Sequence, residues 1–333
     1  MKAGMRAWTA PLLLTLAALA LPWLVTQPAQ QNLLILALMA AQLGVAWNIV
    51  GGYAGQVSLG HAAFYGIGAY TSTMLLLAWG LNPWAGALAG GAVAVGVGLL
   101  IGWPCFRLKG HYFTMATIAV AEIVQTLFNN WEPAGAAVGL TIPMTQTGLA
   151  AMVFDGKLPY YYLALGLLVF SMGVCVALEK SHVGYYLRAI KDEPDAARSL
   201  GVNLTRYKLV ALALSSFLCA LGGTLYAQKE LYIDPGSVLS TGLSIKMALA
   251  AIRGGVGTLW GPLVGAVALT AIEEGSRALL GGSGRGTDLI VYASLIIAIA
   301  VWQPGGLVGW VRALKLKRLQ RQAAERAERE QAA

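Results

Sequence analysis

The sequence is poor in charge. Asp, Glu, Lys and Arg make up only 11% of its 333 residues, whereas 57% are hydrophobic. Soluble globular domains carry about 25% charged residues, so this composition excludes an ordinary soluble domain. A spanning helix needs about 20 apolar residues, and the chain has room for about ten such helices with their loops. The composition therefore predicts an all-α integral membrane protein.

Cysteine and histidine are also scarce. The three cysteines are far apart and form no C-x-x-C motif, and there are three histidines, so no disulfide framework, zinc site or other metal site is expected. The chain lacks the G-x4-GK[ST] phosphate loop, and no nucleophile lies beside a base and an orienting acid, so an enzyme is not expected. The net charge is +8, and the basic residues are concentrated in particular loops. This distribution indicates that they set the orientation of the chain in the membrane rather than bind nucleic acid.

Hydrophobic segments predict ten spans, of which the eighth is short. They cover residues 10–26, 32–50, 56–79, 84–103, 112–130, 160–178, 208–228, 239–252, 259–275 and 288–302. The first segment could be a cleaved signal peptide, but no convincing cleavage site follows it, which favours a retained helix. With both termini cytoplasmic, eighteen basic residues fall in inside loops and four in outside loops. This asymmetry follows the positive-inside rule and supports ten spans.

The longest charged interruption is residues 181–206, SHVGYYLRAIKDEPDAARSLGVNLTR, in the predicted cytoplasmic loop after the sixth span. Asp192 or Glu193 can cap a short helix there, and Pro194 fits its first turn. Gly201 can end that helix in the left-handed conformation. A helix of about two turns is expected between them. It is either a surface for a partner or one helical turn in a solvated loop.

Two glycine-rich stretches interrupt the membrane part, GGYAGQVSLGHAAFYGIG (residues 51–68) and GGVGTLWGPLVG (254–265). Glycine at this density loosens helices, and free backbone groups in a membrane need buried protein or a water-filled cavity. One interpretation is a broken helix along a translocation path. The other is tight packing at a short cytoplasmic turn. The candidate path residues of the first stretch are Gly55, Gln56, Ser58, Gly60 and His61, and the glycine turn of the second is Gly254, Gly255 and Gly257.

Glu122 lies near the centre of the fifth predicted span. Carboxylates inside membranes are costly and are usually functional or paired, so Glu122 joins the candidate path residues. Lys246, in the eighth span, is a possible partner. A neutral carboxyl group with a structural hydrogen bond is the alternative.

The predicted domain division is a transmembrane domain, residues 1–311, and a basic tail, residues 312–333. In the tail, Arg321, Glu325 and Arg329 recur at helical spacing, which predicts a cytoplasmic helix in solvent or on the membrane surface.

Within the charged loop, Asp195-Ala196-Ala197-x3-Gly201 resembles the E-A-A-x3-G coupling loop of ABC importer permeases, with Asp in place of Glu. A longer similarity, over residues 33–309, is to the second permease subunit of branched-chain amino-acid ABC importers. It rests on AWNIVGGYAGQVSLGHAAFYGIGAYT (46–71), FRLKGHYFTMATIAVAEI (106–123), GYYLRAIKDEPDAARSLGVNLTRYKL (184–209), GGVGTLWGPLVGA (254–266) and QPGGLVG (303–309).

The resemblance implies an ABC importer permease in the bacterial inner membrane, which translocates leucine, isoleucine or valine from an extracytoplasmic binding protein. It implies a second homologous permease and two ATP-binding subunits, on which the helix around Asp195 docks. ATP belongs to those subunits, so no cofactor is expected here. Related permeases of urea and short-chain amides share much of the pattern, and an ion-coupled secondary transporter that uses Glu122 is a further alternative.

Two positions depart from the family pattern. The family usually has T-G-G-x-x-G in the long outer loop, where this chain has residues 134–139, AGAAVG, with Ala136 at the second glycine. An apolar residue usually precedes the second glycine-rich stretch, where this chain has Arg253. The first change could alter the outer surface, and the second could add a contact to the ATPase or to lipid headgroups.

Overall fold

The computed structural model of the chain describes residues 19–23, 25, 27–144, 147–280 and 294, and these are mostly helical. The long helices are α2 (Pro28–Asn48), α3 (His61–Trp79), α4 (Pro83–Cys105), α5 (His111–Asn129), α6 (Lys157–Lys180), α9 (Leu204–Glu230), α11 (Thr241–Gly255) and α12 (Gly261–Leu280). The shorter ones are α7 (His182–Asp192), α8 (Pro194–Ser199) and α10 (Pro235–Val238). A five-residue π-helix (Ile49–Tyr53) continues α2.

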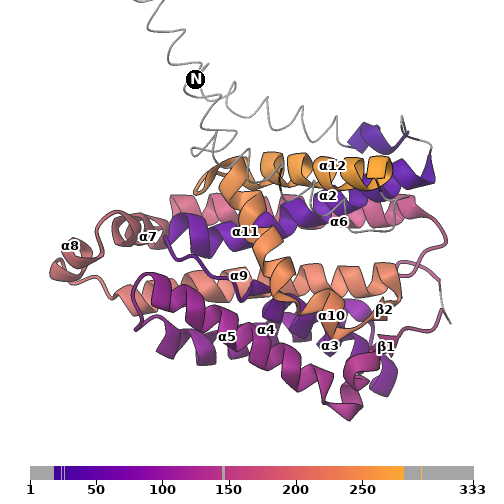
Figure 1. Ribbon diagram of the computed structural model, residues 1–333, viewed down its shortest axis with the longest axis horizontal. Helices are drawn as coiled ribbons and strands as arrows, with labels where there is room; N and C mark the ends of the chain where they lie inside the picture. The colour runs from indigo at the N-terminus through magenta and orange to yellow at the C-terminus, as the bar shows by residue number, and fades with distance from the viewer. Residues whose placement is uncertain (1–18, 24, 26, 145–146, 281–293, 295–333) are drawn as a thin grey trace, which may run out of the picture.

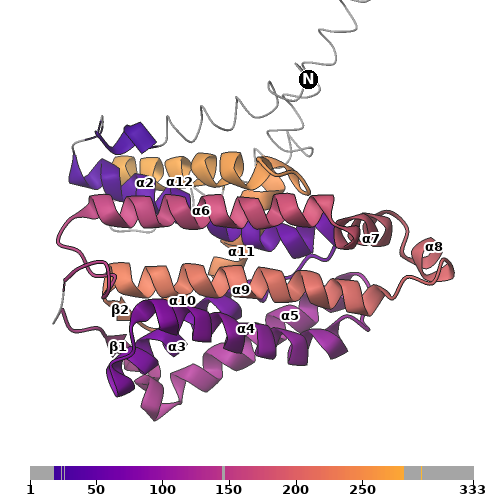
Figure 2. The same ribbon diagram turned by 180° about the vertical axis from the view of Figure 1, so that it is seen from behind.

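The long helices form two groups that run along one common direction. Helices α2, α6 and α12 lie on one side of the bundle, and α3, α4, α5 and α9 lie on the other (Figure 1, Figure 2). Helix α11 crosses obliquely between the two groups and packs on both α12 and α2. Helices α7 and α8 project from one end, and the short strands β1 (Leu140–Thr141) and β2 (Tyr232–Ile233) pair at the opposite end.

Glycine allows α3 and α9 to cross in close contact. A Cβ atom added to Gly68 would lie 2.2 Å from the carbonyl oxygen of Ala220, and one added to Gly223 would lie 1.9 Å from that of Tyr65. Because both obstacles are backbone atoms, no side-chain rotation could relieve the clash. Small residues at helix crossings are the usual device for packing helices inside a membrane, where the hydrophobic effect gives helices little reason to associate.

The second to ninth predicted spans coincide with α2, α3, α4, α5, α6, α9, α11 and α12. In the described part of the chain, five stretches are long and apolar enough to cross a membrane: Pro28–Tyr53, Pro83–Cys105, Lys157–Lys180, Leu204–Glu230 and Pro235–Gly255. The third span begins at His61 rather than at residue 56, because Gly55 takes φ +68° and the next five residues are not helical. The tail and most of the first and last spans lie outside the described residues, so the ten-span count and the cytoplasmic termini stay predictions.

The loop between α5 and α6 contains two 3-10 turns (Glu132–Ala134 and Ala136–Val138) before β1. Gly139 (φ +82°) lies so close to β2 that an added Cβ atom would be 2.1 Å from the carbonyl oxygen of Ile233. Ala136, which replaces the usual glycine, also has a positive φ, +47°. A Cβ atom makes this backbone conformation unfavourable by about 1–2 kcal/mol, so the replacement is tolerated at a cost in strain.

Candidate functional site

Two consecutive short helices, α7 and α8, project from one end of the bundle (Figure 1). The Ser181 hydroxyl begins α7 by accepting a hydrogen bond from the Gly184 N–H at 3.3 Å. Gly184, Leu187 and Ile190 form the buried face of α7. The sequence did contain this signal, since the three residues recur at i, i+3 and i+6 behind a serine cap. Residues 182–192 were expected to be part of a loop, so helix α7 was not predicted.

The short helix expected after Glu193 is confirmed as α8. Pro194 occupies its first turn, and Glu193 stands at the N-cap position with an extended backbone but without a side-chain cap. Asp192, the other suggested cap, is instead the last residue of α7. Gly201 has φ +83°, and its N–H donates to the carbonyl oxygen of Arg198 at 2.9 Å. Glycine favours this left-handed conformation, so it ends the helix as predicted.

The motif residues of α8 divide into an inward and an outward set. Ala197 is only 3% exposed and packs against the rest of the chain, whereas Asp195 and Ala196 are exposed. Leu200, at the end of the helix, is 85% exposed. A large apolar side chain in that position offers contact area to a partner. Leu200 was not among the predicted site residues.

The two glycine-rich stretches meet, and Lys191 of α7 lies against both. A Cβ atom added to Gly55 (φ +68°) would lie 3.0 Å from Cγ of Lys191, and one added to Gly257 (φ +74°) would lie 3.0 Å from its Nζ. Gly257 also approaches the carbonyl oxygen of Gly52 in the π-helix. Stretches about 200 residues apart in the sequence therefore form one junction next to α7.

Asn48 stabilises this junction with two hydrogen bonds. Its Oδ1 accepts a hydrogen bond from the Gly257 N–H at 2.9 Å, and its Nδ2 donates to the carbonyl oxygen of Thr258 at 3.1 Å. Asn48 is only 1% exposed, and the π-helix begins at the next residue. One buried amide thus joins the end of α2 to the turn between α11 and α12. Asn48 was not predicted as a site residue, because a single asparagine in an apolar segment carries no signal of its partner.

Replacing Asn48 with leucine is expected to destabilise the protein by about 2–4 kcal/mol, because two partly buried backbone groups lose their partner at roughly 1–2 kcal/mol each. Thermal unfolding of the purified chain in detergent measures the effect. Asn130→Leu is the matched control, since the exposed Asn130 side chain, just after the end of α5, donates its hydrogen bond to the Thr126 carbonyl oxygen of that helix. Equal unfolding temperatures for the two variants would refute the role given to Asn48.

His61 and Ser58, two of the candidate path residues, are buried inside the bundle. The ring nitrogens of His61, which is 0% exposed, lie 3.0 Å from Ser58 Oγ and 2.9 Å from Ser215 Oγ. The Ser215 hydroxyl donates to the carbonyl oxygen of Ala46 at 2.6 Å, so it can only accept from His61, and Nε2 carries the proton. The histidine therefore joins α3, α9 and α2 as a packing element.

The other two candidates near His61 differ from each other. Gly60 packs against α5, since an added Cβ atom would lie 2.6 Å from the carbonyl oxygen of Thr117. Gln56 is partly exposed, and its amide donates only to the nearby carbonyl oxygens of Ala54 and Gly55, at 3.4 and 3.3 Å. Of Gln56, Ser58, Gly60 and His61, Gln56 alone is partly exposed, and the other three are buried.

The glycine turn lies in a tightly packed contact between α11 and α12. Gly254 and Gly255 are buried at the end of α11, and an added Cβ atom on Gly254 would lie 1.6 Å from the carbonyl oxygen of Gly261. Gly255 has φ +132°. Glycine is thus needed here for the close approach of α11 and α12.

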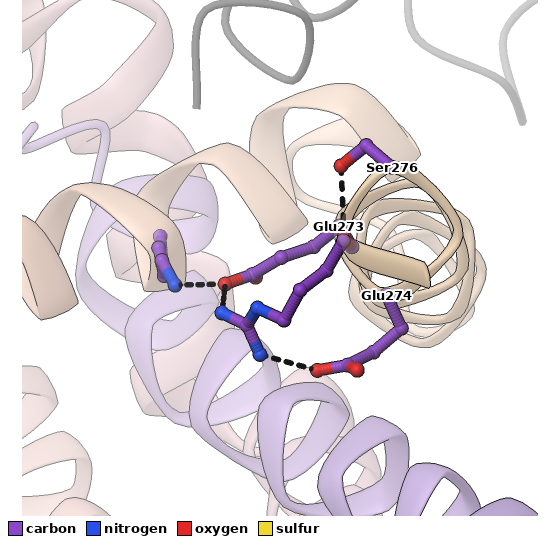
Figure 3. Close-up of polar contacts among 5 residues, drawn as sticks. Glu273, Glu274 and Ser276 are labelled. Atoms are coloured by element: carbon purple, nitrogen blue, oxygen red, sulfur yellow. Dashed lines mark hydrogen bonds and ion pairs between the residues drawn. The ribbon is translucent and has the colours of Figure 1, made fainter. Parts of the chain in front are cut away.

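Glu122 and Lys246 do not pair. The exposed Glu122 carboxylate accepts a hydrogen bond from the Thr241 hydroxyl, and Lys246 Nζ lies 2.6 Å from Glu273 Oε1. Arg277 contacts Glu273 at 3.3 Å and Glu274 at 2.8 Å, which completes a formally neutral network between α11 and α12 (Figure 3). The expected pair was wrong because Glu273 and Glu274, two adjacent acids in the ninth predicted span, were not considered as partners.

Comparisons with known proteins give consistent results. A family model described as "Branched-chain amino acid transport system / permease component" matches residues 30–299. The permease protein LivM of the high-affinity branched-chain amino acid transport system of Salmonella typhimurium is 30% identical over 299 residues, which cover 83% of this chain and 69% of the relative. LivM of Escherichia coli is 29% identical over 328 residues, 91% of this chain and 76% of the relative. LivH of Salmonella typhimurium is 23% identical over 284 residues, 81% of this chain and 91% of the relative.

Proposed function

Because the chain belongs to the family of branched-chain amino acid transport system permease components, we propose that it is one membrane subunit of an ATP-driven importer of leucine, isoleucine and valine. It is a transport subunit and not an enzyme. The observation that best supports the proposal is α8, which is held by the buried Ala197 and presents Asp195 and Leu200 outward at the projecting end of the bundle. A partner can press on such a helix without disturbing the core.

The importer that we propose has several subunits. LivM and LivH relatives each match more than four fifths of this chain, which supports a pair of homologous permeases around one path. Two ATP-binding subunits contact α8 and carry the nucleotide, so this chain needs no cofactor. An extracytoplasmic binding protein delivers the amino acid near β1 and β2, at the end opposite α8. The complex resides in the bacterial inner membrane.

The proposed mechanism is alternating access driven through α7. Closure of the ATP-binding pair moves α8, and α7 follows because only Glu193 separates the two helices. Lys191 then displaces Gly55 and Gly257, against which it lies. These glycines mark the end of α2 and the turn between α11 and α12, and positions at the ends of elements absorb hinge motion most readily.

The exposed face of α5 is the proposed wall of the path. Met115, Ile123 and Leu127 are each more than 60% exposed, and Glu122 with its partner Thr241 lies beside them. An aliphatic amino acid is both apolar and zwitterionic, so this mixture of apolar surface and hydrogen-bonding groups suits it. Of the candidate path residues, we assign Gly55, Gln56 and Glu122 to the path, because these three are exposed or partly exposed.

The proposed function is tested by reconstituting the complete importer in liposomes with its binding protein and ATP inside. Uptake of labelled leucine is expected to require ATP and to be inhibited by unlabelled isoleucine and valine. Inhibition by urea or acetamide instead would assign the substrate to the amide-transporting relatives. Uptake that needs no ATP and collapses with an ionophore would replace the proposal with an ion-coupled transporter.

A further inference from the structure

A basic cavity of about 480 Å³ lies next to the coupling helix. Gly55 and Gln56, the connection between α4 and α5, the α7–α8 turn and the first turns of α9 enclose it. Its charged lining residues are five bases and one acid: Arg107, Lys109, Lys191, Arg198, Lys208 and Asp195. A cavity with this excess of positive charge attracts an anion.

Lys208 is a buried cation of the cavity without an acidic partner among the described residues. The residue is only 9% exposed, and none of the ion pairs among the described residues includes it. Its Nζ lies 6.0 Å from the centre of the Phe106 ring. Asp195 contacts Arg198 instead, at 3.9 Å, and both side chains are more than 60% exposed. A buried ammonium without a counter-charge is unfavourable, so an anion in the cavity would stabilise the protein.

The basic cavity adjoins an apolar groove of about 630 Å³ between α4 and α9. Leu99, Trp103, Val210 and Phe217 line the groove, and Thr205 lines both the groove and the cavity. Trp103 is 54% exposed, and the Arg107 guanidinium stands 4.1 Å above its ring centre. Tryptophan and basic side chains of this kind gather where the hydrocarbon of a bilayer meets its headgroups.

We propose that the groove and the cavity together bind one anionic phospholipid, with its phosphate beside Lys208 and Arg107 and an acyl chain between α4 and α9. Basic pockets between membrane helices are suited to such headgroups. A carboxylate from a protein partner would neutralise the positive charge of the cavity, but it would leave the adjoining apolar groove without an occupant. The site goes beyond the proposed transport function, because it needs a bilayer but not an ATPase.

The test measures the binding of fluorescent phosphatidylglycerol to the complete importer, purified in mild detergent. Lys208→Met and Arg107→Gln each remove one charge and are expected to weaken binding about fivefold, and the double variant about 25-fold. Arg188→Gln is the matched control, because Arg188 pairs with Glu179 and lines neither the groove nor the cavity. Arg107 is exposed, so its variant gives a reading even if Lys208→Met fails to fold.

Each alternative has its own outcome. Equal affinity for phosphatidylcholine, or unchanged binding by the double variant, would overturn the proposal. Displacement of the lipid by millimolar inorganic phosphate would replace it with a site for a free anion. Lipid that binds the isolated chain but not the assembled importer would assign the cavity to an acidic group of the ATPase. Loss of leucine uptake with lipid binding intact would affect only the proposed transport function.

Discussion

The double variant Asp195→Arg with Gly201→Pro is expected to lose both its ATP-binding subunits and ATP-driven uptake. Gly201 has φ +83°, whereas proline holds φ near −65°, so the chain can no longer leave α8 in its present direction. Asp195 is exposed, and its reversal changes the charge of the surface that a partner meets. Central residues of an interface each contribute about 2 kcal/mol or more, so binding should fall by at least about 30-fold. Affinity purification from mild detergent, followed by quantification of the ATP-binding subunits, measures the loss.

The control for this experiment is Asp155→Arg. It makes the same charge change at another exposed aspartate, in the loop that precedes α6 and therefore away from α8. It should leave the ATP-binding subunits in place. Retention of those subunits by the double variant, together with normal uptake, would show that α8 is a solvated turn and not the coupling helix. Recovery of the second permease in every sample separates lost coupling from misfolding.

The sequence predicted those structural features that depend only on residues close together in the chain, such as helix ends and long apolar helices. The end of α8 was predicted because Pro194 and Gly201 restrict their own backbone angles. Hydropathy likewise located eight long helices, because each contains a long run of apolar residues, although in α3 this run is largely buried inside the bundle. The helix α7 was missed although its pattern was present, since its buried face is only three residues long.

Contacts between distant segments could not be read in the same way. His61 meets Ser215 across 154 positions, and Asn48 meets Thr258 across 210. A polar residue in a membrane helix predicts that some partner exists, but not which helix supplies it. A buried histidine needs a hydrogen-bond partner, and a serine inside the bundle supplies it for His61. Lys246 likewise pairs with Glu273 rather than with Glu122. The partner of each polar side chain therefore depends on which helices pack side by side, and this packing could not be predicted from the sequence.

Gly254→Ala is expected to cause the largest loss of stability among single substitutions in the glycine turn. The new Cβ atom would lie 1.6 Å from the carbonyl oxygen of Gly261, 2.3 Å from its carbon and 2.9 Å from the Gly265 nitrogen. All three are backbone atoms, so α11 and α12 must separate along their whole contact. Overpacked cores lose about 1–3 kcal/mol where side chains can adjust, and here none can, so a loss of about 3 kcal/mol or more is expected.

Gly242→Ala is the matched control for Gly254→Ala, because it makes the same change in the same helix with no atom within 4 Å of the new Cβ. Alanine favours a helix over glycine by up to about 1 kcal/mol, so this variant should be neutral or more stable. Thermal unfolding in detergent and uptake in liposomes are measured on both. A stable Gly254→Ala protein that no longer transports would contradict the packing role and show that Gly254 is needed for motion. Gly254→Ala could instead lose both stability and transport while Gly242→Ala keeps both. That result would mean that the close contact of α11 and α12 positions the glycine junction next to α7.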